Sequence, residues 1–189
     1  MIASELDLEK PFIFELPEIL SPDECELWIA RIRKLGTDLA TINTRTGTQV
    51  ESLIRNNRRV IIDDRDSASD LFERVKEVVP LEIHGCKLIG VNERLRCYEY
   101  EQGQRFAPHL DAAFIRNDKE QSFYTFMVYL NEGFEGGETV FFVEPEVVIR
   151  PMTGMALFFQ HPIIHESCEI KSGVKYALRT DLMYRNFDE

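Results

Sequence analysis

The segment Val174-Lys-Tyr-Ala-Leu-Arg-Thr-Asp-Leu-Met-Tyr184 predicts a long, mostly apolar β-strand near the end of the chain. It is the last of eight short strand candidates that begin after Asn92 and recur at spacings of about ten residues. Turn-forming pairs such as Gly136-Gly137 and Ser172-Gly173 separate them, with no helical period between. The expected strands are 94–100, 105–111, 122–130, 138–143, 146–150, 155–160, 163–170 and 174–184. This pattern predicts an all-β sandwich or barrel, of which the jelly roll is the eight-stranded form.

The residues before these strands predict two helices and one further strand. Ser21-Pro22-Asp23-Glu24 combines an N-cap hydroxyl, a proline suited to the first turn and a Glu placed for a capping box. The helical period that follows ends at Gly36. Residues 58–62 predict a strand, and Ser67 is expected to cap a second helix over residues 68–79.

A length of 189 residues predicts a single domain. We expect an N-terminal support of about residues 1–91 and a catalytic β-core of about residues 92–184. Residues 36–52 are rich in Thr, Asn and Gly and predict a mobile loop. The loop around residues 40–57 is therefore expected to order over the functional site only when a substrate binds.

Charge and composition exclude some classes of partner. The chain has 33 acidic and 22 basic side chains and a formal net charge of −11, which disfavours binding to nucleic acid or anionic lipid. No apolar run approaches the roughly 18 residues of a membrane span, and the N-terminus lacks the features of a signal peptide. The four cysteines form no CxxC pair and are expected to be reduced thiols. We therefore expect a cytoplasmic protein without nucleic-acid or membrane partners.

Two histidines and one aspartate have the pattern of a metal site. On a strand, His109 and Asp111 point to the same face, and His165 follows 54 residues after Asp111 on another predicted strand. Two histidines and one carboxylate form the facial triad of non-haem iron(II) oxygenases. His161 is the alternative to His165, because Lys171 follows His161 at the same ten-residue distance that separates His165 from Lys175.

Lys175 stands in an otherwise apolar strand, where a charge is unfavourable unless it meets an anion. A bound dicarboxylate would supply that anion. The alternative is a side chain that extends to the surface. Strand alternation places Ala177 and Arg179 on the same face as Lys175, so Arg179 is expected in the same cavity. Lys171 precedes the turn Ser172-Gly173 and is expected in solvent, which favours His165 over His161.

Five segments together resemble the prolyl 4-hydroxylase-like family of iron(II)- and 2-oxoglutarate-dependent oxygenases. They are Tyr100-Glu-Gln-Gly-Gln-Arg-Phe-Ala-Pro-His109-Leu-Asp111, Tyr129-Leu-Asn131, Gly136-Gly-Glu-Thr139, Gly154-Met-Ala-Leu-Phe158, and His165 followed by Gly173-Val-Lys175. The resemblance covers about residues 91–184. It implies a mainly β fold, with a double-stranded β-helix core of the jelly-roll or cupin-like kind and N-terminal helices packed on it.

The resemblance also implies roles for single residues. By position, His109, Asp111 and His165 match the iron(II) ligands of the family. Lys175 and Tyr129 match residues that bind the distal carboxylate of 2-oxoglutarate. The remaining cosubstrate candidates are Tyr100 on the cavity wall, and Thr125 and Met127, which strand parity places on the face of Tyr129.

The function implied by the resemblance is a dioxygenase that hydroxylates an unactivated C–H bond, most simply of a prolyl residue in a peptide or protein. Its cofactors would be iron(II), 2-oxoglutarate and ascorbate as reductant, with dioxygen as the second substrate. The alternatives are a hydroxylase of free amino acids or small molecules, and a non-catalytic cupin-like metal-binding module, which Lys175 disfavours. A nucleic-acid demethylase is disfavoured by the acidic charge.

The identity of the substrate stays open at this stage. Ser167 stands where the family usually has Gly, and Tyr176 stands where collagen-type enzymes have Trp. The candidate substrate contacts are Arg179, Arg96, Arg55 and Asn57.

Overall fold

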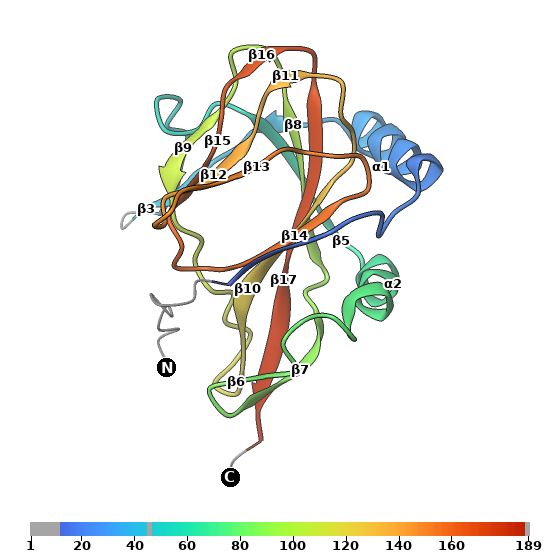
Figure 1. The fold of residues 1–189 in the computed structure, drawn as a ribbon, viewed down its shortest axis with the longest axis vertical. Coiled ribbons are helices and arrows are strands. Elements are labelled where there is room, and N and C mark those ends of the chain that lie inside the picture. Colours follow the sequence, from blue (N-terminus) through green and yellow to red (C-terminus); the bar gives the residue numbers. More distant parts are fainter. Residues whose placement is uncertain (1–11, 45–46, 188–189) are drawn as a thin grey trace.

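The structure is a computed structural model that describes residues 12–44 and 47–187. It contains two helices, α1 (Pro22–Leu35) and α2 (Arg65–Val75), and two main β-sheets. Figure 1 shows both helices on one side of the large sheet, while β9, β12 and β15 of the smaller sheet lie on the other. This arrangement confirms the predicted mainly β jelly-roll core with N-terminal helices packed on it.

The large sheet is antiparallel and is organised around its longest strand, β17 (Lys175–Asn186). β17 pairs with β10 and with both β8 and β7 along its length. The other members are β1 (Ile13–Leu16), β2 (Asp38–Leu39), β5 (Arg58–Asp63), β6 (Glu82–Ile83), β7 (Cys86–Val91), β8 (Arg94–Tyr100), β10 (Glu120–Tyr129) and β14 (Ala156–Gln160). Lys175 is paired with Tyr100 and Arg179 with Arg96, which fixes the depth of each in the cavity.

The smaller sheet brings together segments that are far apart in the sequence. Its order is β13 (Val147–Ile149), β12 (Thr139–Phe141), β15 (His165–Ser167) and β9 (Phe106–His109). In the pairing of β9 with β15, His165 lies directly opposite His109. Two short strands, β11 (Glu135–Gly136) and β16 (Ile170–Ser172), form a separate pair. The predicted strand 163–170 is thus two strands, β15 and the start of β16, that belong to different sheets.

The sequence predicted the start of α1 correctly but not the start of α2. At α1 the capping box is present: the Ser21 hydroxyl accepts from the Glu24 amide at 3.2 Å, and the Glu24 carboxylate accepts from the Ser21 amide at 2.8 Å. The prediction that Ser67 caps α2 was wrong. The Asp64 carboxylate accepts from the Ser67 amide at 3.0 Å, so the helix begins at Arg65, before the predicted start at residue 68, and it ends at Val75, before the predicted end at residue 79.

The prediction that residues 36–52 form a mobile loop was wrong in part, because this stretch contains strands. This stretch contains β2 and a hairpin of β3 (Ile42–Thr44) and β4 (Gly47–Gln49), while residues 45 and 46 lie outside the described residues. The hairpin is made by backbone hydrogen bonds between two very short strands, which need no hydrophobic alternation. The ordering of residues 40–57 over a substrate stays a prediction.

Two apolar clusters hold the layers together. One lies between the helices and the large sheet and includes Ile32, Leu71 and Phe126. The other lies between the two sheets and includes Met127 and Phe159, so it forms the walls of the space between them. Among the described residues, no helix combines the length and apolar character that crossing a membrane requires.

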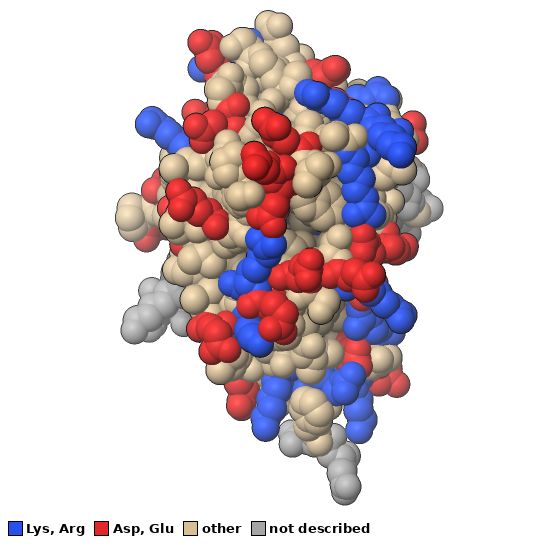
Figure 2. Space-filling model, turned by 90° about the vertical axis from the view of Figure 1, so that its right-hand side faces the viewer, with Lys and Arg blue, Asp and Glu red and all other residues tan. Residues whose placement is uncertain are grey.

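The molecular surface on the side of the two helices carries charges of both signs (Figure 2). Figure 2 shows acidic and basic side chains interspersed over this face, without a large area of one sign. Several are paired, including Arg31 with Asp64 at 2.7 Å and Arg94 with Asp63 at 3.0 Å. Exposed pairs of this kind contribute little to stability, so the fold depends on the two apolar clusters.

Gly154 allows the segment that leads into α1 to approach the β-core closely. Its φ is +76°, and a Cβ atom placed there would lie 2.0 Å from the carbonyl oxygen of Leu20. Gly103 has almost the same φ, +79°, with nothing within 4 Å of such an atom. Both substitutions by Ala carry left-handed strain of roughly 1–2 kcal/mol, but only Gly154→Ala also forces backbone apart.

We predict that Gly154→Ala lowers the free energy of unfolding by at least about 2 kcal/mol more than Gly103→Ala. Urea denaturation of the two variants and the parent chain measures this difference. Equal losses in the two variants would show that the contact between Leu20 and Gly154 is not as tight as described.

Candidate functional site

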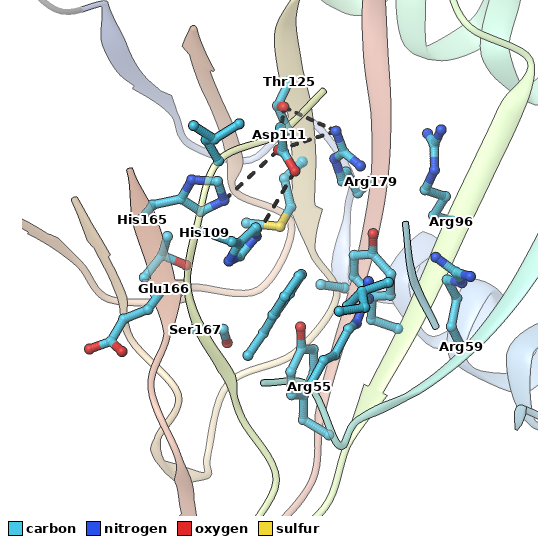
Figure 3. Close-up of a pocket in the computed structure, with 18 of the residues that line it drawn as sticks. Arg55, Arg59, Arg96, His109, Asp111, Thr125, His165, Glu166, Ser167 and Arg179 are labelled. Carbon is cyan, nitrogen blue, oxygen red and sulfur yellow. Dashed lines mark hydrogen bonds and ion pairs between the residues drawn. The ribbon is translucent and has the colours of Figure 1, made fainter. Parts of the chain in front are cut away.

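His109, Asp111 and His165 meet at one end of the space between the sheets. Their potential ligand atoms all lie within 4.8 Å of one another. The Nε2 atoms of His109 and His165 are each 3.9 Å from an oxygen of Asp111. Figure 3 shows both imidazoles turned toward the Asp111 carboxylate. The pairing of β9 with β15 brings the histidines together, and Asp111 lies two residues beyond the end of β9, whereas the predicted strand included it.

The other ring nitrogen of each histidine faces a backbone carbonyl. His109 Nδ1 lies 2.8 Å from the Ala107 oxygen, and His165 Nδ1 lies 2.9 Å from the Ile163 oxygen. A carbonyl oxygen only accepts, so we assign the proton to Nδ1 and the free lone pair to Nε2. Burial lowers the pKa of both rings, that of His109 to about 3, so both are neutral and able to bind a metal at neutral pH.

Asp111 is held as a carboxylate by two donors. Thr125 donates to its Oδ2 at 2.6 Å, and Arg179 Nη2 lies 3.1 Å from the same oxygen. Burial by itself would raise the pKa of Asp111, but the charge of Arg179 keeps it well below its usual range. With Oδ2 engaged in this way, Oδ1 is the oxygen that lies nearest to His109.

This donor set fits a divalent transition metal. Two neutral imidazole nitrogens and one carboxylate oxygen converge from one side, and a cavity of about 410 Å³ opens on the other. Such a facial arrangement leaves coordination positions open for other molecules, as in non-haem iron(II) sites. The ligand role of the three residues is a proposal that rests on this geometry.

Lys175 lies in the same cavity and is 1% exposed. Its Nζ donates to the Gly137 oxygen at 2.6 Å and to the Ser167 hydroxyl at 3.0 Å, and lies 5.3 Å from the ring centroids of Tyr100 and Tyr129. None of the ion pairs found among the described residues involves it. Burial lowers the pKa of Lys175 to about 7, because the charged form lacks a paired anion. Ser167, the departure from the family's usual Gly, is thus a neighbour of the lysine.

The structure places most other predicted site residues around the cavity. Tyr129 is not part of the cavity lining. It lies behind Thr139, with the two hydroxyl oxygens 2.6 Å apart. Asn57 also lies behind the wall and accepts a hydrogen bond from Arg55 Nε at 2.7 Å. The predicted residues that line the cavity are Tyr100, Thr125, Met127, Arg179, Arg96 and Arg55.

His161 and His165 have different surroundings. His161 is 1% exposed, and its two ring nitrogens lie 2.8 Å from the Ser122 hydroxyl and 3.0 Å from the Thr125 hydroxyl. It therefore orients Thr125, which in turn binds Asp111, and it is not among the grouped ligand atoms. His84 is exposed on a turn and Lys171 is exposed on β16.

Sequence reasoning missed several residues that line the cavity, among them Arg59, Thr139 and Phe159. Thr139 is inside the quoted motif Gly136-Gly-Glu-Thr139, and Arg59 lies on a strand that was predicted. The alternation of β5 gives its two faces, but the sequence does not tell which of them meets the cavity. For Phe159 the available signal is the alternation of side chains along β14, which likewise does not tell which face of the strand meets the cavity.

Comparison with known proteins agrees with this geometry. The sequence model of the 2OG-Fe(II) oxygenase superfamily matches residues 95–180. Prolyl 4-hydroxylase 1 of Arabidopsis thaliana is 24% identical over 191 residues, which cover 88% of this chain and 67% of that protein. Probable prolyl 4-hydroxylase 3 of the same plant is 29% identical over 139 residues, which cover 70% of this chain and 46% of that protein. The chain thus spans between about half and two thirds of these relatives.

A solved structure supports the same fold. The viral collagen prolyl hydroxylase of Paramecium Bursaria Chlorella virus-1, in complex with 2-oxoglutarate, superposes with a TM-score of 0.66. The two proteins are 22% identical, and the match covers 95% of this chain and 99% of that one.

We predict that His165→Ala weakens binding of Mn²⁺, used in place of iron(II), by at least about a hundredfold, because one of three protein ligands is lost. His84→Ala, at an exposed histidine, is expected to leave the affinity unchanged. Calorimetric titration of both variants, each checked for thermal unfolding, provides the measurement. Tight binding that survives in His165→Ala would remove His165 from the site.

We further predict that 2-oxoglutarate binding to the Mn²⁺-loaded protein weakens as the pH rises above about 7. The pKa of Lys175 in the empty site is about 7, so the ammonium is present below that pH and is lost above it. The dissociation constant should be flat below pH 7 and rise by up to about tenfold per pH unit above it. Calorimetry between pH 6 and 9 measures the profile.

Variants at Lys175 and Lys171 provide the controls for that profile. Lys175→Arg should bind 2-oxoglutarate with little pH dependence, because the guanidinium stays protonated. Lys175→Ala should raise the dissociation constant by about a hundredfold, and Lys171→Ala should have no effect. The same pH dependence in Lys175→Arg would contradict the role given to Lys175.

Proposed function

Since the chain belongs to the 2-oxoglutarate- and iron(II)-dependent oxygenases of the prolyl 4-hydroxylase-like family, we propose that it is a dioxygenase that hydroxylates an unactivated C–H bond. Its cosubstrates are 2-oxoglutarate and dioxygen. The observation that carries this proposal is the presence of the three grouped metal-binding side chains and the buried Lys175 in one cavity.

Lys175 separates this function from simple metal binding. A cupin-like module that only holds a metal needs no buried ammonium at the far end of its cavity. A lysine that is 1% exposed and bonded only to neutral oxygens is unfavourable unless an anion joins it. A dicarboxylate that chelates the metal with its 2-oxo acid end can extend its second carboxylate to this position.

Each residue then has a defined task. His109, Asp111 and His165 hold the metal ion, while Thr125 and Arg179 fix the orientation of Asp111. Lys175 pairs with the distal carboxylate of 2-oxoglutarate through charge-assisted hydrogen bonds. The buried rings of Tyr100 and Phe159 exclude water from the space between the lysine and the metal. Bound iron(II) supplies the activation of dioxygen, coupled to the conversion of 2-oxoglutarate to succinate and carbon dioxide.

A prolyl residue of a peptide or protein is the substrate that we propose. The similar proteins from Arabidopsis and from the Chlorella virus carry the names of prolyl hydroxylases, which supports this class. We also propose ascorbate as the reductant that keeps the iron in the +2 state. The four cysteines form no CxxC pair in the sequence and three of them are buried, which supports a reducing compartment such as the cytoplasm.

The function predicts succinate release that depends on iron(II), on 2-oxoglutarate and on a proline-containing peptide. Mass spectrometry of a proline-rich peptide pool should show the gain of one oxygen atom on proline. His109→Ala and Lys175→Ala should lose at least about 99% of the succinate formed, since each removes a group that the cosubstrate complex requires. Lys171→Ala should retain full activity.

Two results would contradict the proposal. Metal binding without any succinate release, under all of these conditions, would favour the non-catalytic module. Succinate release that no proline peptide stimulates would retain the enzyme class and remove peptidyl proline as the substrate.

A further inference from the structure

The cavity extends well beyond the part that 2-oxoglutarate needs. The cosubstrate is expected between the metal ligands and Lys175, along the side formed by β17 and β10. From there the cavity continues across Tyr98 and Arg96 of β8 to Arg59 of β5. In Figure 3, Arg59 and Arg96 lie on the far side of Arg179 from the two histidines. This second part is the space left for the substrate that is hydroxylated.

Arg55 is the most unusual side chain in this second part. It is 5% exposed, and its guanidinium lies between two rings, 4.3 Å from the centroid of Phe106 and 4.8 Å from that of Tyr98. Asn57 binds its Nε, but its Nη2 is buried without a hydrogen-bond partner. A buried donor without an acceptor is unfavourable, and more so when it is charged. The neutral side chains around Arg55 hold a cation in place and leave one of its donors free.

The other charges of the cavity do not compensate Arg55. Arg96 and Arg179 are balanced by Asp181 and Asp111, through contacts of 3.1–3.2 Å. Figure 3 shows Glu166 beside His165, with its side chain directed away from the arginines. Among the described residues, no carboxylate lies within ion-pair distance of Arg55.

Arg59 adds a second cation without an acidic partner on the described part of the chain. Its Nη2 donates to the Thr41 hydroxyl at 3.1 Å, and it lines the same part of the cavity. Bound iron(II) and the 2-oxoglutarate dianion have equal and opposite charges, so they leave the excess positive charge of this region unchanged. A neutral prolyl peptide would leave both arginines without an anion.

We propose that the substrate presents a carboxylate to Arg55 and Arg59, close to the carbon that is hydroxylated. The proposal rests on the proposed function, of which it names the substrate class. A guanidinium fork fits a planar carboxylate with two parallel hydrogen bonds, and the apolar rings around Arg55 strengthen that interaction by excluding water. The carboxylate belongs either to an acidic residue next to the proline or to the free terminus of a small substrate.

The test compares acids with their neutral counterparts. The probes are N-acetylated, C-amidated proline peptides with Glu or Gln beside the proline, and short prolyl peptides and free proline with a carboxylate or an amide terminus. Binding is measured by calorimetry to the protein loaded with Mn²⁺ and 2-oxoglutarate in the absence of oxygen. At least one acid should bind about tenfold or more tightly than its neutral counterpart. Which pair shows the preference identifies the source of the carboxylate.

Variants of Arg55 and Arg59 test whether these two residues cause the preference for acids. Arg55→Met fits the sandwich between Phe106 and Tyr98 without a charge and should abolish the preference, while Arg55→Lys should retain part of it. Arg59→Met, at a half-buried position, should reduce it and provides the test if Arg55→Met fails to fold. Arg105→Met makes the same exchange at an exposed side chain and should change nothing. Affinity for Mn²⁺ and for 2-oxoglutarate should be unaltered in all four.

Three results would overturn the inference. In the first, no acid binds more tightly than its neutral counterpart, which includes a screen in which nothing binds. In the second, the preference survives in both Arg55→Met and Arg59→Met. In the third, Arg55→Met weakens 2-oxoglutarate as strongly as Lys175→Ala does, which would make Arg55 a cosubstrate ligand. Succinate release is scored separately, so acid-selective binding without turnover would reject the enzymatic proposal and retain the carboxylate site.

Discussion

The placement of buried charges along β17 is the constraint on which the rest of the structure depends. This strand lies inside the large sheet, yet Lys175, Arg179 and Asp181 are all largely withdrawn from solvent. Charges in such a position are tolerated only if each has a partner. Arg179 has Asp111 and Asp181, at 3.1 and 3.2 Å, whereas Lys175 has only neutral oxygens. The strand therefore links the proposed metal site to a position that is prepared for an anion.

The two sheets contribute different side chains to the proposed metal site. The smaller sheet supplies both histidines, and its register sets one opposite the other. The large sheet supplies Arg179 and Thr125, which hold Asp111 between the sheets. Because the proposed metal ligands come from the segments of the smaller sheet and the groups that orient Asp111 come from the large sheet, the proposed metal site depends on the packing of one sheet against the other. The apolar cluster that includes Met127 and Phe159 maintains that packing.

Strand alternation explains why much of the fold and of the cavity could be predicted from the sequence. It correctly placed Lys175, Ala177 and Arg179 on one wall, since a period of two needs no knowledge of the partners. The prediction failed where contacts between residues far apart in the sequence determine the local structure. Asp64 caps α2 in place of Ser67 while it also pairs with Arg31 of α1, a contact that local sequence does not reveal. Likewise Arg59 lies on a predicted strand, but its face is set by the neighbouring β8.

The central claim is that one cavity holds a metal ion and 2-oxoglutarate between the ligand triad and Lys175. Crystals grown with Mn²⁺ and 2-oxoglutarate without oxygen, measured at the manganese absorption edge, test it most directly. The account predicts one anomalous peak about 2.0–2.3 Å from His109 Nε2, an Asp111 oxygen and His165 Nε2, with the distal carboxylate about 3 Å from Lys175 Nζ. A peak elsewhere, a site built on His161, or a distal carboxylate bound to Arg179 would contradict it.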